Sequence, residues 1–177
     1  MAKRISLREF QANLTARLGS AQRGESSRAL LGIESGRGTD RFWLLDLAES
    51  GEVSPLSASG GITPVPLTQP WFAGVTNIRG VLYSVVDFSA FRGGEPTVQN
   101  ADARLLLIGA RHGVNSALLV SRTLGLRPPE GLTVLDEADT GGAAWMGRRY
   151  DDAENRHWRR LRIQTLLSDP AFLDIAL

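Results

Sequence analysis

The sequence predicts a mainly β protein, built from small closed or nearly closed barrels with a helix at each end of the chain. Short apolar runs recur along the sequence and are separated by turns rich in glycine and proline. No helical stretch of about 10 to 15 residues separates these runs, so the crossovers that a parallel sheet requires are missing. Short strands at this spacing are typical of small barrels.

The composition is that of an ordinary globular protein that can bury a core. The chain has 177 residues, of which 42% are hydrophobic and 22% are charged. We expect a helix and linker over residues 1–27, a β domain over 28–168 and a C-terminal helix over 169–177. The absence of cysteine excludes disulfides and thiolate sites, and the net charge of +1 argues against nucleic-acid binding. The apolar runs are too short to span a bilayer, and the first 20 residues lack the apolar core of a secretion signal, so we expect a cytoplasmic protein with no membrane insertion.

The first predicted element is an amphipathic helix that begins at a capping box, Ser6-Leu7-Arg8-Glu9. Ile5 and Phe10 stand where a hydrophobic staple requires apolar residues, and Gly19 is placed to end the helix. Its apolar residues form one stripe, which consists of Leu7, Phe10, Leu14 and Leu18. This stripe requires a cover, either the protein's own β core or a partner. The polar residues 19–28 then form a linker.

Three pairs of strands are predicted in the middle of the chain. Segments 30–33 and 42–47 form a hairpin with a loose loop, and segments 104–109 and 115–120 form another. Between them, segments 75–78 and 81–86 are joined by Arg79-Gly80, where Gly80 supplies the positive φ of a tight turn. Three prolines at positions 64, 66 and 70 remove backbone donors, so residues 62–70 are predicted to be a stiff exposed loop.

The last third of the chain carries two further signals. Pro128-Pro129 ends an extended segment, and Ser168-Asp169-Pro170 supplies a cap and a first-turn proline for a short helix that exposes Phe172 and Ile175 on one side. Arginines cluster at positions 148, 149, 156, 159, 160 and 162, with acidic residues among them. This cluster is either a solvated surface or a surface for an anionic partner.

Catalytic and metal-binding equipment is sparse. The two histidines, His112 and His157, lie in unrelated predicted elements and are interpreted as surface residues. No nucleophile elbow, phosphate loop or dinucleotide fingerprint occurs, and the acidic group around Asp136 lacks the ligand spacing of a calcium loop. We therefore expect no catalytic residue, no metal and no cofactor.

Surface recognition is the remaining function, and its candidate residues lie around the Arg79-Gly80 turn. Trp71 and Phe72 follow a rigid proline loop, so they are either an exposed aromatic anchor or part of the core. Asn77 can bond the turn backbone and Arg79 can reach a carboxylate, so both either brace the turn or contact a partner. The complete set of partner-binding or turn-bracing candidates is Trp71, Phe72, Val75, Asn77, Ile78, Arg79, Gly80, Val86 and Asp87.

This region resembles the signature of the CheW-like domain family. The matching positions are Pro66, Pro70, Phe72, Gly74, Val75, Asn77, Arg79, Gly80, Val85, Val86 and Asp87. The resemblance covers residues 28–168 and is strong over 62–91. It implies two five-stranded, SH3-like barrels packed around a hydrophobic cleft, with the chain passing from one barrel to the other and back. Ser84 and Ser121 depart from the family pattern, where proline and aspartate are common.

The resemblance also implies a function. It indicates a non-catalytic adaptor that couples the cytoplasmic tip of methyl-accepting chemoreceptors to the regulatory domain of a CheA-type histidine kinase. One barrel edge would pair with the kinase and the cleft would take a receptor helix hairpin, so the protein would join membrane-bound receptor arrays. The N-terminal helix and the ending 166–173 are similar to the PilI type of coupling protein, which serves type IV pilus twitching motility.

Two other classes of function stay open on the sequence. A small β-barrel enzyme or ligand-binding protein would place Asp87, Arg79 and a histidine together in a concave cleft. An oligonucleotide-binding barrel would require aromatic residues on a basic sheet face, for which Trp158 among arginines is the only hint.

Overall fold

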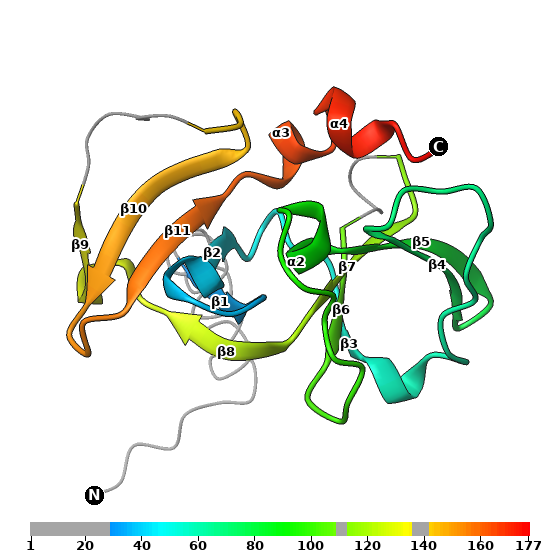
Figure 1. Cartoon of the computed structure of the whole chain (residues 1–177). Coiled ribbons are helices and arrows are strands. Elements are labelled where there is room, and N and C mark those ends of the chain that lie inside the picture. The colour runs from blue at the N-terminus through cyan, green and yellow to red at the C-terminus, as the bar shows by residue number, and fades with distance from the viewer. Residues whose placement is uncertain (1–28, 109–112, 136–141) are drawn as a thin grey trace, which may run out of the picture.

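The computed structural model describes residues 29–108, 113–135 and 142–177. These residues form two β-sheets that lie side by side, with short helices between and above them (Figure 1). The predicted N-terminal helix lies outside the described residues. Among the described residues, no helix has the length and apolar composition needed to cross a bilayer.

The first sheet has six strands in the order β8-β1-β2-β11-β10-β9. The strands are β1 (Leu30–Glu34), β2 (Phe42–Asp46), β8 (Arg122–Arg127), β9 (Leu132–Val134), β10 (Met146–Asp152) and β11 (His157–Leu161). All pairs are antiparallel except β11 with β2, which are parallel. The predicted hairpin of segments 30–33 and 42–47 is confirmed by the β1–β2 pair.

The second sheet has five strands in the order β3-β6-β7-β5-β4. The strands are β3 (Val53–Pro55), β4 (Phe72–Ile78), β5 (Val81–Asp87), β6 (Arg104–Leu107) and β7 (Ser116–Val120). The antiparallel pairs β4–β5 and β6–β7 confirm the other two predicted hairpins, and β5 with β7 is parallel. The described chain thus enters the first sheet with β1 and β2, forms the whole second sheet, and returns to the first through β8.

In each sheet a single bent segment supplies strand pairing at both edges. Residues 122–134 pair with β1 before the 3-10 turn Pro129–Gly131 (η3) and with β10 after it. In the second sheet, β3 pairs with β6, and Thr63, beyond the turn Leu56–Ala58 (η2), bridges to Val75 of β4. The implied five-strand count therefore fits the second sheet, whereas the first has six strands because the prolines at 128 and 129 divide one extended segment into β8 and β9.

Strands in the centre of the molecule are buried on both faces, and this explains their continuous apolar runs. Alternate residues of β6 and β7 belong to different clusters: Leu105 and Leu119 lie in a core enclosed by the second sheet, whereas Leu106 and Leu118 lie in a core shared by both sheets. The first sheet encloses a third, smaller core around Leu44 and Trp158.

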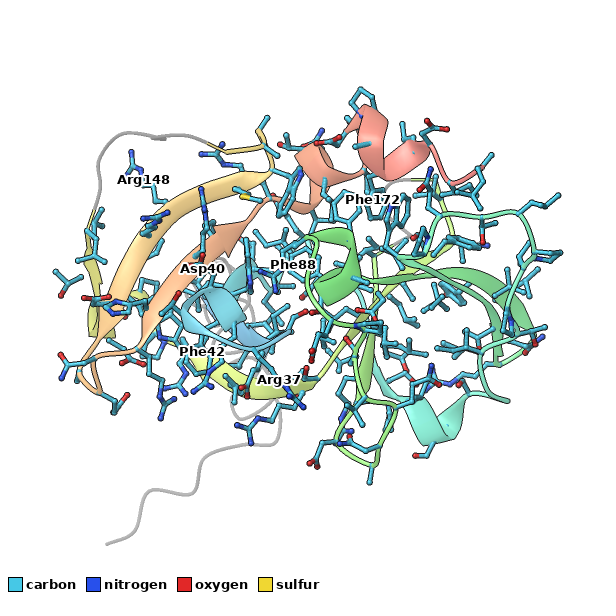
Figure 2. All side chains as sticks on the ribbon, in the orientation of Figure 1. Arg37, Asp40, Phe42, Phe88, Arg148 and Phe172 are labelled. Atoms are coloured by element: carbon cyan, nitrogen blue, oxygen red, sulfur yellow. The ribbon has the colours of Figure 1, made fainter. Side chains whose placement is uncertain are left out.

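Short helices complete the shared core. They are α2 (Phe88–Phe91), α3 (Ile163–Leu166) and α4 (Pro170–Leu173), whereas the 3-10 turn η1 (Thr39–Arg41) lies between β1 and β2 and buries no residue. Phe88 of α2 projects between the two sheets, and α3 and α4 run along one side of them (Figures 1 and 2). As predicted, Asp169 caps α4 and Pro170 stands in its first turn. The expectation that Phe172 is exposed is wrong, because its ring packs on Trp71 and Phe91 in the shared core.

Candidate partner-binding surfaces

The turn between β4 and β5 is fixed by its own residues. Arg79 and Gly80 have φ values of 52° and 85°, so both central residues are left-handed, as a two-residue hairpin turn requires. The Asn77 side-chain oxygen accepts a hydrogen bond from the Gly80 amide at 2.9 Å. Gly80 can adopt this conformation without strain, and Asn77 holds it in place.

Arg79 reaches across from this turn to the opposite edge of the second sheet. Its two terminal nitrogens donate to the carboxylate oxygens of Glu52 at 2.8 and 2.7 Å, which is a bidentate pair. Glu52 immediately precedes β3, and β3 and β4 are the two edge strands of the sheet. The ion pair therefore joins the two edges at the end of the sheet where the hairpin turns.

A second link between the same edges depends on Gly74. The Thr63 amide and carbonyl both hydrogen-bond to Val75, at 2.8 and 2.9 Å, and this brings Thr63 and Pro64 against Gly74. A Cβ atom on Gly74 would overlap the Thr63 carbonyl and lie 2.9 Å from the Pro64 Cα atom. Gly74 has φ 133°, a second reason for glycine at this position of the motif.

Asp87 ends β5 and organises the chain that follows it. One carboxylate oxygen caps α2 by accepting from the Ser89 and Ala90 amides at 3.0 and 3.2 Å. The carboxylate also accepts from the Thr97 amide at 2.6 Å and the Thr97 hydroxyl at 2.8 Å. Because Asp87 is buried and these donors surround it, its role in the structure is to fix α2 and the 93–97 loop.

The aromatic pair after the proline loop lies mainly inside the molecule. Phe72 is 8% exposed and Trp71 is half-buried against Phe91 and Phe172. Trp71 and Phe72 therefore do not form an exposed aromatic anchor, and Phe72 is part of the core. Val86 and Ile78 are buried as well, and Val75 is half-buried at the margin of the shared core.

Two exposed apolar residues that the sequence analysis did not single out lie beside Arg79. Val81 and Leu82, the first residues of β5, are 41% and 60% exposed. We call Arg79, Val81 and Leu82 the hairpin-tip surface. The sequence does indicate their exposure, because consecutive residues of a strand point to opposite faces, and two apolar side chains next to a hairpin turn cannot both reach a core.

An apolar pocket lies farther along β5, between the second sheet and the C-terminal segment. Its volume is about 160 Å³, and its lining comprises Phe72, Ser84, Val86, Val114, Ser116, Leu167, Phe172, Leu173 and Ile175. We call this the C-terminal pocket. Its outer residues Val114, Leu173 and Ile175 are exposed. Ser84, which replaces the proline common in the CheW-like pattern, is thus part of the pocket lining.

A polar pocket of about 200 Å³ lies where the β1–β2 loop meets the 93–100 loop, and Ser121 is part of its lining. Beside it, Arg92 joins the two sheets: its guanidinium donates to the Asp40 and Ser35 carbonyls at 3.0 and 2.6 Å and stacks over Trp43 and Phe88. Burial lowers the pKa of Arg92, while Asp40 and Asp87 oppose this shift. Arg92 remains a cation and holds the β1–β2 loop against α2.

The arrangement proposed for an enzyme does not form. Arg79 lies in the turn before the seven-residue strand β5 and Asp87 is the last residue of that strand, so the two are roughly 20 Å apart. The Asp87 carboxylate already accepts hydrogen bonds from Thr97 and from the amides of α2. His157 is exposed and contacts Asp151 at 2.6 Å in the first sheet, and His112 lies outside the described residues. In the part of the chain that the structure describes, no group of three or more acidic or histidine side chains could hold a metal.

The arginine cluster is spread over β10, β11, the turn between them and the residue that precedes α3. Arg148 projects from the outer side of β10 (Figure 2), and Arg160 pairs with Asp46 at 3.2 Å.

At the tip of the β10–β11 hairpin, burial acts to raise the pKa of Asp152. Hydrogen bonds from the Arg156 amide, the Trp158 indole and the Glu154 amide outweigh this effect and lower the pKa. Trp158 is buried in the first sheet, so it is not on a basic surface as an oligonucleotide-binding barrel would require.

Two sheets that share one core and offer apolar surfaces are suited to binding other proteins, as in the binding or scaffolding class. A family model, the CheW-like domain, matches residues 40–135, which is more than half of the chain. The chain belongs to the CheW-like domain family. This membership supports a non-catalytic scaffold or adaptor role in chemotaxis signalling.

A solved structure agrees on the fold. The scaffolding protein TtCheW from Thermoanaerobacter tengcongensis superimposes with a TM-score of 0.59, covering 76% of this chain and 88% of that chain at 16% sequence identity. At this identity the likeness concerns the fold alone. No curated protein is significantly similar to the chain.

Proposed function

We propose that this protein is an adaptor that holds a CheA-type histidine kinase against the cytoplasmic tips of chemoreceptors. In this proposal the hairpin-tip surface, with the adjoining edge of the second sheet, contacts the regulatory domain of the kinase. The C-terminal pocket takes a receptor helix hairpin. The protein would act in the cytoplasm at membrane-bound receptor arrays.

The observation that carries this proposal is the presence of two apolar surfaces on one body. Exposed Val81 at the hairpin tip belongs to the face of β5 that turns toward the enclosed core, as Val85 does. The C-terminal pocket uses the opposite face of the same strand, through Ser84 and Val86. Leu82 shares the face of Ser84 and Val86, so the contact that stays separate from the pocket is formed by Arg79 and Val81; a partner bound there leaves the pocket free, which an adaptor requires.

The apolar pocket also suits a helical partner. An amphipathic helix inserts apolar side chains spaced one turn apart into such a groove. Exposed Leu173 and Ile175 at its margin would provide the contact around that insertion.

Pull-down experiments with the two purified partners test the proposal. Val81→Glu should reduce binding of the kinase regulatory domain, and Leu173→Glu should reduce binding of a receptor tip fragment. Val98→Glu, at a site that is 63% exposed and outside both surfaces, serves as the matched control and should reduce neither. Failure of the unaltered protein to bind either partner would overturn the proposal.

We further propose that the pathway is twitching motility through a PilI-type role. The supporting features are the predicted N-terminal helix and the ending 166–173. Deletion of the gene in a host that both twitches and swims should abolish twitching and leave swimming intact, and the opposite result would assign the protein to the flagellar pathway.

A further inference from the structure

Exposed apolar residues occur both at the margin of the C-terminal pocket and next to it. Val114 and Leu173 at its margin are 43% and 59% exposed. The final residues extend this surface, because the Leu177 amide donates to the Leu67 carbonyl at 3.1 Å and both side chains are exposed. Exposed apolar residues gathered around a concave apolar site indicate a docking surface.

The C-terminal segment that borders this surface carries only acidic charge. Residues 163–177 contain two acidic side chains, Asp169 and Asp174, and no lysine or arginine. Asp174 is exposed, and Asp169 uses one carboxylate oxygen to cap α4. A basic amphipathic segment would therefore complement both the shape and the charge of the surface.

One segment of this chain has that chemistry. Residues 1–18 carry four basic side chains, Lys3, Arg4, Arg8 and Arg17, and one acidic side chain, Glu9. The same segment contains the predicted amphipathic helix, whose apolar stripe needs a cover. These residues lie outside the described part of the chain.

The linker is long enough to bring that segment to the pocket. The described chain begins beside Leu47, whose amide donates to the Ala29 carbonyl at 3.2 Å. Two residues farther on, the Glu49 carboxylate accepts from the amide of Ile163, the first residue of α3, at 3.2 Å. Helix α3 leads directly to Leu167 in the pocket lining. The ten residues 19–28 can span up to about 35 Å, which exceeds this short path.

We propose that residues 6–18 dock as a helix on the C-terminal pocket of the same molecule, with the stripe Leu7, Phe10, Leu14 and Leu18 against its apolar lining. The N-terminal segment then covers a surface that would otherwise be free for a partner. If the proposed function is correct, this contact is autoinhibitory, because a receptor helix must displace it. The docking itself does not depend on that function.

The absence of cysteine allows a direct test by paired cysteine substitutions. Under mild oxidation, Leu14→Cys with Leu173→Cys should form an intramolecular disulfide several-fold faster than two control pairs. Thr15→Cys with Leu173→Cys controls for the polar side of the helix, and Leu14→Cys with Val98→Cys controls for the effect of the tether, which alone raises the local concentration. Equal rates in the three variants, or cross-linked dimers in place of monomers, would overturn the proposal.

A second measurement uses no cysteine and no partner. Phe10→Glu in the full chain should increase amide hydrogen exchange several-fold over residues 173–177 by uncovering the pocket. Gln11→Glu, on another face of the predicted helix, should leave the exchange unchanged. Unaltered exchange in Phe10→Glu would contradict docking, whereas loss of receptor binding with docking intact would contradict the proposed function alone.

Discussion

The guanidinium of Arg79 and the carboxylate of Glu52 form two parallel hydrogen bonds, although 27 positions separate them in the sequence. One residue belongs to the turn after edge strand β4, and the other immediately precedes edge strand β3. The pair is exposed, with 75% of the Arg79 side chain and 42% of the Glu52 side chain accessible. It shapes the hairpin-tip surface more than it stabilises the fold, because water competes for both charges.

Arg79→Ala should therefore lower the free energy of unfolding by no more than about 1 kcal/mol, as measured by urea denaturation. Binding of the kinase regulatory domain should weaken far more, because the hairpin tip loses its orientation. Arg37→Ala, which removes another exposed arginine with a long ion pair to Glu95, is the control and should alter neither quantity. A large loss of stability in Arg79→Ala would show that the pair is a structural requirement.

Gly74 and Gly80 both have positive φ, yet alanine should have different effects at the two positions. Gly74→Ala places a Cβ atom against the Thr63 and Pro64 backbone and should cost roughly 2 to 5 kcal/mol. Gly80→Ala meets nothing within 4 Å and should cost only about 1 to 2 kcal/mol of backbone strain. Urea denaturation of the two variants would compare them directly, and equal losses would contradict the close crossing at Thr63.

Asp87→Ala should be one of the most destabilising single substitutions in the second sheet. It removes the cap of α2 and leaves the Thr97 amide buried without its acceptor, so the expected loss is about 2 to 4 kcal/mol. Asp102→Ala, at an exposed position, should change the free energy of unfolding by less than about 0.5 kcal/mol. A mild effect of Asp87→Ala on stability, combined with loss of partner binding, would instead indicate a direct contact role.

The lowered pKa of Asp152 predicts a contribution to acid sensitivity. Because the folded-state pKa lies below the usual value of 3.8, the stabilisation is present above that value and is lost as the pH falls through the folded-state pKa. Asp152→Asn should flatten the decline in unfolding free energy between about pH 5 and pH 3. Glu154→Gln, at the same hairpin tip, provides the comparison, and an identical decline in wild type and Asp152→Asn would argue against the hydrogen bonds to Trp158 and Arg156.

The parts of the fold that were predictable are those with local signals. The three hairpins around β1–β2, β4–β5 and β6–β7 combine apolar strands with glycine turns, and the structure confirms each pairing. Strands β10 and β11 carry many charged residues, and the register of their hairpin shifts between Met146 and Arg149, while β11 pairs with the distant strand β2, so no local pattern gives their register. Strand β3 has only three residues and is defined by its pairing with β6.

The candidate surfaces were less predictable for a related reason. The turn-bracing chemistry of Asn77 and Gly80 is local and follows from residue type, whereas the partner of Arg79 depends on how two edge strands meet. The burial of Phe72 and Phe172 depends on α4, which packs near β4 and α2 from a distant part of the sequence. The C-terminal pocket arises from the same meeting of segments.

Between β2 and β8 of the first sheet, the chain forms the entire second sheet, and this connection limits how the two sheets can move relative to each other. Two chain segments and the shared apolar core connect the two sheets, and the hydrogen bonds from Arg92 to the β1–β2 loop add a further connection. A load applied to one half must then move the other half with it, as in a rigid lever. The molecule is therefore suited to relaying displacement between neighbours without bending.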